Sequence, residues 1–186
     1  TNTSSNVISA TITVIPTANS CTGTPSTYTI TVNPSPTVTV PANITVCNGS
    51  PVAATNFTSP TSGTTYTWSN NNTTIGLAAS GSGNIASFNA TNNTANPITA
   101  TITVTPGANS CTGTPSTYTI TVNPTPTVTV PANITVCNGS AITATNFSSA
   151  TPGATYTWNN NTTSIGLGAT GSGNIAGFTG TNTSTA

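Results

Sequence analysis

The stretch "ITATITVTPGANSCTGTPSTYTITV", from Ile98 to Val122, decides the fold of this chain. In both arms of the stretch, apolar residues alternate with threonine, and turn-forming residues separate the two arms. Period-two alternation rich in Thr, Val, Ile and Tyr is typical of half-buried antiparallel strands, and helical periodicity is absent. The residues that we expect in the hydrophobic core are Phe57, Tyr66, Trp68, Ile102, Val104, Tyr118, Ile120 and Val122.

Working outward from this stretch, shorter runs of the same kind are separated by clusters of Gly, Pro, Asn and Ser, which form turns. About seven short strands in about 90 residues, with a Trp on the third strand, predict an immunoglobulin-like β-sandwich. The further strand candidates are "TVTV" at Thr37, "NITV" at Asn43, "VAATNF" at Val52, "TYTW" at Thr65, "TIGLA" at Thr74 and "IASFNA" at Ile85.

The chain repeats itself with an offset of 90 residues, as between Cys21 and Cys111. The segment from Cys21 to Ser50 returns at Cys111 to Ser140 with one change, Ser35 to Thr125. A fixed period of this length indicates a tandem array of structural units.

The proline-rich segments "NPSP" and "NPTP" follow strand-like runs and are the best candidates for linkers between units. They divide the chain into the C-terminal part of a preceding repeat at 1–34, one complete repeat at 35–124 and the N-terminal part of a following repeat at 125–186. Two explanations fit this pattern. Either the chain is a window on a longer tandem protein, or protomers complete each other's half-domains end to end, so that 125–186 receives the strands of the next chain's 1–32.

No Lys, Arg, Asp, Glu or His occurs among the 186 residues. General acid–base catalysis, calcium binding and phosphate neutralisation all need such groups, so we expect no enzyme, no metal, no cofactor and no nucleic-acid partner. No apolar run is long enough to span a membrane. Neutrality also predicts that folding depends little on acid or salt.

At fixed spacing, "PTVTVPANITVCNGS", "YTW", "ITATITVTP" and "CTGTPSTYTITVNP" resemble the PKD-like, Ig-like tandem repeats of giant secreted surface proteins of Bacteroidetes. This resemblance covers the whole chain. It implies an all-β fold of tandem antiparallel sandwiches, export by the type IX system, and roles in adhesion, gliding or extracellular filaments. Many PKD-type domains carry acidic residues and some bind calcium, so the absence of carboxylates here keeps metal binding from being carried over.

In an exported protein, four cysteines that form two copies of one pair predict structural disulfides. The first choice is a Cys47–Cys111 bond, with Cys21 and Cys137 paired outside the window or to a neighbouring protomer. The rivals are a pair of bonds across the junctions, Cys21–Cys47 and Cys111–Cys137, and four free buried thiols.

The function predicted from the sequence is that of a structural unit, stacking neutral domains end to end in an extracellular filament, stalk or giant adhesin. Its partners are then copies of itself or adjacent repeats, with surface glycans as an addition. The alternative is a module that binds carbohydrate or ice through its Thr- and Asn-rich faces. The features that favour this alternative are Trp68 and Trp158 as stacking platforms, the "SNNNTT" loop at Ser69, and the threonine rows 27/29/31 and 99/101/103. The Asn-x-Ser/Thr triplets at Asn43, Asn48, Asn56, Asn72, Asn89 and Asn133 have the form of glycosylation acceptors, but their number is expected by chance in a sequence so rich in Asn, Ser and Thr.

Overall fold

The computed structural model describes residues 1–183, so the last three residues of the predicted partial repeat 125–186 lie outside the described residues. The chain divides into two compact units. The first comprises Thr1–Asn92 and Pro97–Asn123, and the second comprises Asn93–Asn96 and Pro124–Ala186. The finer division of the first unit at residue 34 stays a prediction.

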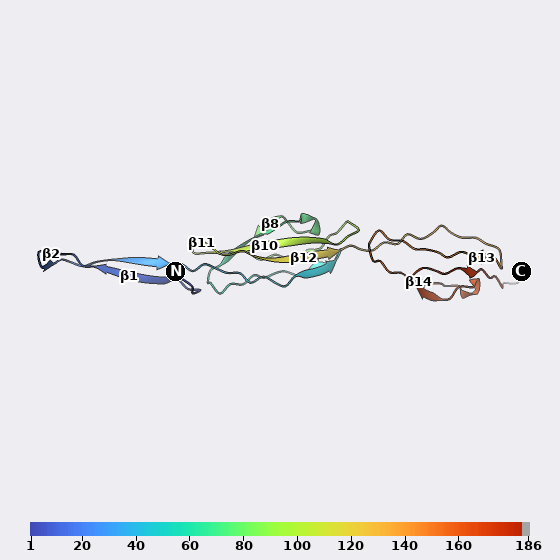
Figure 1. Ribbon diagram of the computed structural model, residues 1–186, viewed down its shortest axis with the longest axis horizontal. Helices are drawn as coiled ribbons and strands as arrows, with labels where there is room; N and C mark the ends of the chain where they lie inside the picture. Colours follow the sequence, from blue (N-terminus) through green and yellow to red (C-terminus); the bar gives the residue numbers. More distant parts are fainter. Residues whose placement is uncertain (184–186) are drawn as a thin grey trace. The chain divides into compact units, whose positions relative to one another are not determined.

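The first unit is built on a sheet with the strand order β5–β12–β10–β7–β8, to which β11 adds by pairing with β10. Strands β8, β10, β11 and β12 are labelled in Figure 1. The longest strands, β10 and β12, are the two arms of the stretch that opened the sequence analysis. The bounds in this unit are β5 Ile44–Cys47, β6 Pro51–Val52, β7 Thr65–Asn70, β8 Ser80–Ser82, β9 Phe88–Asn89, β10 Ile98–Ala108, β11 Cys111–Thr112 and β12 Ser116–Asn123, with the 3-10 turn η1 at Thr73–Ile75.

One pair in this sheet departs from the antiparallel arrangement expected from the sequence. Strand β5 runs parallel to β12, with Ile44 opposite Ile120, whereas the other pairs are antiparallel. The first and last strands of this sheet along the chain, β5 and β12, therefore point the same way. The chain enters the sheet at one end and leaves it at the other, which suits units that follow one another.

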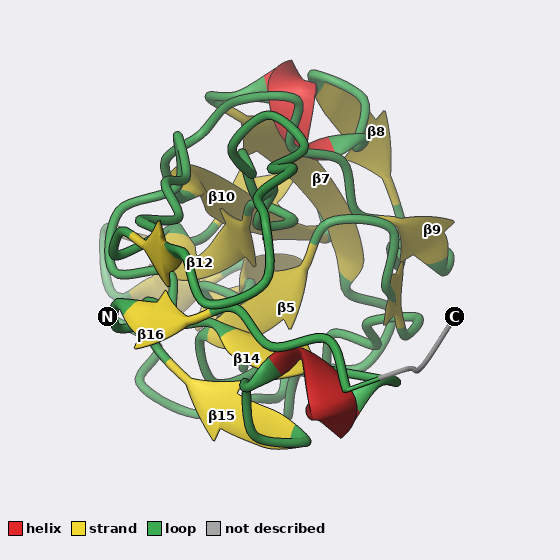
Figure 2. Cartoon of the chain, turned by 90° about the vertical axis from the view of Figure 1, so that its right-hand side faces the viewer, coloured by secondary structure: helices red, strands yellow, loops and turns green. Residues whose placement is uncertain are grey.

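A second, more broken layer faces this sheet. It consists of the β6–β9 pair and of two isolated bridges, Thr39 with Thr58 and Thr55 with Ile85. The core between the layers confirms the sequence-based prediction, because seven of the eight expected residues are buried and the eighth, Tyr66, is partly buried against them. Neither unit contains an α-helix within residues 1–183, and the helical segments in Figure 2 are the two 3-10 turns. The fold is an all-β sandwich, as predicted.

Trp68 is held in the core by the opposite strand. A Cβ atom added to Gly81, which lies opposite Trp68 in the β7–β8 pair, would touch the indole ring. The indole therefore covers the glycine, and the pair fixes the position of the ring. Trp158 lies over Gly171 in the same way.

The N-terminal segment of the first unit forms a hairpin that copies β10 and β12. Strand β1 pairs with β4 from Ile8 opposite Val32 to Val14 opposite Ser26, which is the β10–β12 register shifted by 90 residues. At the tip of the hairpin, the β2–β3 pair repeats the pairing of β10 with β11. The bounds are β1 Ile8–Val14, β2 Thr17–Ala18, β3 Cys21–Thr22 and β4 Ser26–Val32.

The second unit copies the front part of the sandwich, but its strands are fewer and shorter. Residues 134–137, which correspond to β5, form no strand, and β14 has three residues where its counterpart β7 has six. Both differences fall where β10 and β12 supply the partner in the complete domain. The bounds are β13 Ala141–Ile142, β14 Thr157–Asn159, β15 Thr170–Ser172, β16 Phe178–Thr179 and the 3-10 turn η2 Thr163–Ile165.

The repeat provides a matched pair of core substitutions. Ile120→Ala should lower the free energy of unfolding of the complete domain by about 2 to 5 kcal/mol, because it removes buried methylene groups and leaves a cavity. Ile30→Ala, at the same position of the β1–β4 hairpin, should change it by less than about 0.5 kcal/mol, since that side chain is exposed. Urea unfolding in a Trp158→Phe background, followed by Trp68 fluorescence, measures both. Equal effects would contradict the assignment of the core.

Candidate assembly site

The β1–β4 hairpin exposes a face that is built for burial. Tyr28 is 54% exposed, whereas Tyr118, its counterpart in β12, is 2% exposed. Val14 is 53% exposed, whereas Val104 is fully buried. These side chains therefore lack the packing that their counterparts have in the complete domain. An isolated two-stranded hairpin is only marginally stable in water, so further packing would stabilise this segment.

The hairpin already has the backbone conformation of its buried copy. At its tip Asn19 and Ser20 both have positive φ angles of 47° and 66°, and Asn109 and Ser110 have 50° and 64°. Two successive left-handed residues are the signature of the type I′ hairpin turn, which matches the twist of the flanking strands. The hairpin therefore needs no change of turn or register in order to adopt the geometry of β10–β12.

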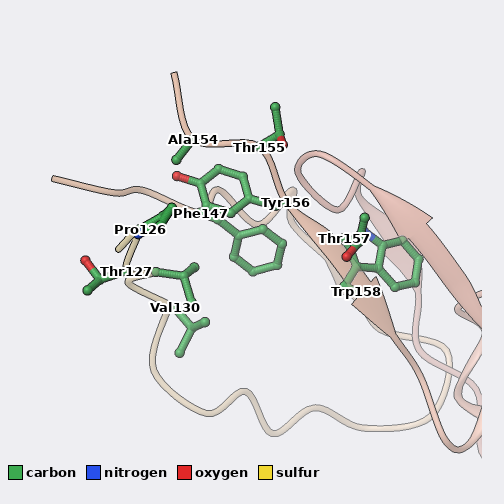
Figure 3. Close-up of a pocket in the computed structure, with 10 residues that line it drawn as sticks. Pro126, Thr127, Val130, Phe147, Ala154, Thr155, Tyr156, Thr157 and Trp158 are labelled. Atoms are coloured by element: carbon green, nitrogen blue, oxygen red, sulfur yellow. The ribbon is translucent and has the colours of Figure 1, made fainter. Parts of the chain in front are cut away.

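The second unit carries a complementary hollow. A groove of about 370 Å³ runs beside Val128, Val130, Phe147, Tyr156 and Trp158 (Figure 3). In the complete domain, strand β10 lies along the corresponding strand, β7, with its residues 104 and 106 opposite residues 68 and 66. The groove is thus the place that β10 fills in the complete domain.

A second hollow of about 290 Å³ lies beside Ile134, Val136, Ile142 and Ile165. Ile165, in η2, is 40% exposed, whereas Ile75 in η1 is fully buried where η1 packs against β10 and β12. Within the described residues, every exposed large hydrophobic side chain lies either in residues 7–32 or in residues 128–165. The two partial repeats therefore hold the exposed large hydrophobic side chains of the described residues, and the complete domain holds none of them.

Amide side chains of the complete domain hold the hairpin by its backbone. The Oδ1 atom of Asn43 accepts a hydrogen bond from the backbone N–H of Thr119 at 2.9 Å, and Oδ1 of Asn71 accepts one from Thr101 at 2.7 Å. Both asparagines recur in the second unit as Asn133 and Asn161. Neutral amides thus take the role that charged groups play in many other interfaces.

The structure does not bring together the two cysteines that the sequence analysis paired. Cys47 lies opposite Asn123, the last residue of β12, whereas Cys111 lies opposite Ala108, before β12 begins. Eight residues of extended strand span about 25 Å, and a disulfide needs Cα atoms within about 7 Å. The expected Cys47–Cys111 bond is therefore not formed, and all four cysteines are free thiols in this structure. Pairing of Cys21 and Cys137 with a neighbouring protomer stays a prediction.

Several of the groups considered as ligand-binding features make contacts within the fold. Both Trp rings cover glycines, and the Oγ1 atoms of Thr99 and Thr121 lie 2.9 Å apart across the β10–β12 pair. In the "SNNNTT" loop, Asn70 donates to the carbonyl of Leu77 at 3.0 Å, and Asn72 caps η1. Among residues 1–183 no cluster of three metal-ligating side chains occurs, and no helix is long and apolar enough to cross a membrane.

The comparison with protein families supports this reading of the first unit. Residues 44–126 match the PKD-like domain family. No curated protein matches the chain. PKD-like domains are sandwich modules that are typically extracellular and generally non-catalytic. The matched range runs from β5 through β12, so it includes the long hairpin and falls on the closed sandwich rather than on either partial repeat.

Two tyrosines set the pH response of the complete domain. Burial raises the pKa of the Tyr118 hydroxyl above its ordinary value of 10.0, and burial also raises the pKa of Tyr66. The folded state thus favours the neutral phenols. Their contribution to stability is complete below about pH 10 and is lost as the pH rises through the higher folded-state pKa.

We therefore expect the free energy of unfolding to stay constant between about pH 4 and about pH 8, and to fall above about pH 10. Chemical denaturation across this range measures it. Tyr118→Phe should reduce the alkaline loss and leave the plateau in place. A steep fall on the acid side would contradict the assignment, because no carboxylate or histidine side chain is present to cause it.

Proposed function

We propose that this chain is a structural segment of an extracellular filament, stalk or giant cell-surface adhesin, in which neutral PKD-like sandwiches follow one another end to end. The observation that carries the proposal is the repeat itself. Along the sequence, one closed domain lies between two partial copies whose strand pairs keep its register, and the first and last strands of its sheet, β5 and β12, run in parallel. Such a unit transmits the chain from one end of the sandwich to the other.

The surface chemistry supports a passive mechanical role. Without charged side chains, neighbouring units neither repel nor attract one another at long range, and screening by salt has no side-chain charges to act on. Proteases that cleave at Lys, Arg, Asp or Glu find no site. These properties suit a material that is exposed to a changing medium.

The connection between the hairpin and the PKD-like domain supports a defined geometry along the chain. Pro34 and Pro36 in "NPSP" are fully buried, and Nδ2 of Asn33 donates to the carbonyl of Asn109 at 2.9 Å. This segment, which we expected to be a stiff linker, is packed into the domain. A connection that packs into the domain supports a structural role for this junction.

Antibodies against the chain should label fibres outside the cell, as seen by immunogold electron microscopy of the source organism. A glycan array and an ice-affinity assay with the same protein should show no specific binding. Cytoplasmic label would contradict the proposal. Specific glycan or ice binding would instead favour a surface binding module.

A further inference from the structure

We propose that the β1–β4 hairpin of one copy completes the open sandwich of the second unit of another copy, so that copies join head to tail by strand complementation. The inference rests on the proposed function, because it supplies the contact between successive links. The hairpin, residues 8–32, is here called the donor, and residues 126–182 are called the acceptor.

The complete domain shows the docked state within the chain itself. The donor differs from residues 98–122 only at Ser9, Ile15 and Thr17, where the copy has Thr99, Thr105 and Gly107. None of these positions is buried in the complete domain, so every core-facing donor residue is conserved between the two copies.

The acceptor also keeps the packing of its copy. Of the buried residues that its counterpart contributes to the core, two differ, with Val52 replaced by Ile142 and Ala90 replaced by Gly180. A Cβ atom added to Gly180 would lie 3.3 Å from Cδ1 of Ile142. The extra methyl group of the isoleucine therefore occupies space that the missing methyl group of the alanine leaves, which conserves volume.

The unpaired backbone groups of the donor and of the acceptor also fit each other. In the complete domain β12 pairs in parallel with β5, and β10 pairs with β7 along six residues. The acceptor has no strand at 134–137 and a shortened β14, and the donor has both of its edges open. Docking supplies a hydrogen-bonded neighbour to both edges of the donor and to both acceptor segments, which is β-strand addition.

The tip of the donor fits the acceptor by contact with proline. A Cβ atom added to Gly113 would clash with the carbonyl oxygen of Pro36, so the backbone of this arm approaches the proline closely. Pro36 is buried in this contact, and its counterpart Pro126 is exposed. The donor carries Gly23 at the corresponding position, and only glycine allows this approach.

Asn92 of the complete domain has a counterpart at both ends of the chain, Asn2 and Asn182. The backbone N–H of Asn92 donates to Oδ1 of Asn48 at 2.8 Å, and Nδ2 of Asn92 donates to the carbonyl of Val122 at 2.7 Å. In the acceptor, Asn182 makes the first bond with Asn138 at 2.8 Å. In the segment just before the donor, Nδ2 of Asn2 makes the second bond, to the carbonyl of Val32, at 2.9 Å. Asn182 and Asn2 thus each make one of the two hydrogen bonds of Asn92. In the docked pair, one of these two asparagines occupies the position that Asn92 has in the complete domain.

The test uses purified chain of residues 1–186 in pairs of variants. Ile12→Asp places a charge on the core face of the donor, whereas the matched control Thr13→Asp places it on the outward face. Ile165→Asp disables the acceptor. We expect the native chain and the Thr13→Asp control to form species that lengthen with concentration in sedimentation velocity, and each of the other two variants to be monomeric.

An equal mixture of Ile12→Asp and Ile165→Asp should give dimers and nothing larger, because one sound donor and one sound acceptor remain. This result also shows that both variants fold. A monomeric native chain, a monomeric mixture or assembly that survives Ile12→Asp would overturn the proposal. A second readout is a disulfide between Thr13→Cys and Asn159→Cys on different copies under glutathione disulfide, since their counterparts Thr103 and Ser69 are paired.

The source of the donor is tested on material from the organism. A band of about 18 kDa on reducing, denaturing gels supports separate copies. A far larger band shows that one continuous chain supplies the hairpin, which overturns the proposal but leaves the filament function standing. Because no side-chain charges meet, the assembly should vary by less than about threefold between about 0.05 and about 1 M sodium chloride.

Discussion

The burial of the β10–β12 hairpin between β5 and β7 is the interaction on which the rest of this structure depends. Where the hairpin is present, the core closes over Trp68 and Ile75 and leaves no large hydrophobic side chain exposed. In the second unit, which has no such hairpin, residues 134–137 form no strand where the complete domain has β5. Strand β14 is shorter than its counterpart β7, and the core is open. The free hairpin at the N-terminus exposes the other half of the same contact.

Because the chain has no charged side chains, the specificity of the hairpin contact comes from other interactions. With no ion pairs available, orientation comes from the alternation of large apolar and threonine side chains, from strand register and from asparagine side chains that bind the backbone. Asn84 accepts from Phe57 at 2.9 Å and Asn43 accepts from Thr119, which ties segments together that are far apart in the sequence. A one-residue slip of the hairpin would turn its apolar face outward, so register is strongly fixed.

The two ends of the chain differ from the closed domain in exposure rather than in sequence. Tyr28 and Tyr118 lie in identical surroundings along the chain, yet one is exposed and the other is buried. The same local pattern forms a hairpin in both places, because turn chemistry and alternation are local. Its burial depends on the presence of the front part of the sandwich, which is a non-local condition.

From the sequence alone we predicted the all-β fold, the repeat, the core residues and the lack of catalytic and metal-binding groups, because alternation, turns and composition are written directly in the residue order. The parallel β5–β12 pair, the burial of Pro34 and Pro36 and the separation of Cys47 from Cys111 were decided by the tertiary structure. Spacing along the chain does not say at which end of a strand a residue lies once that strand has paired. The complementary grooves and the exposed hairpin face likewise emerged only when the three copies of one pattern were compared in space.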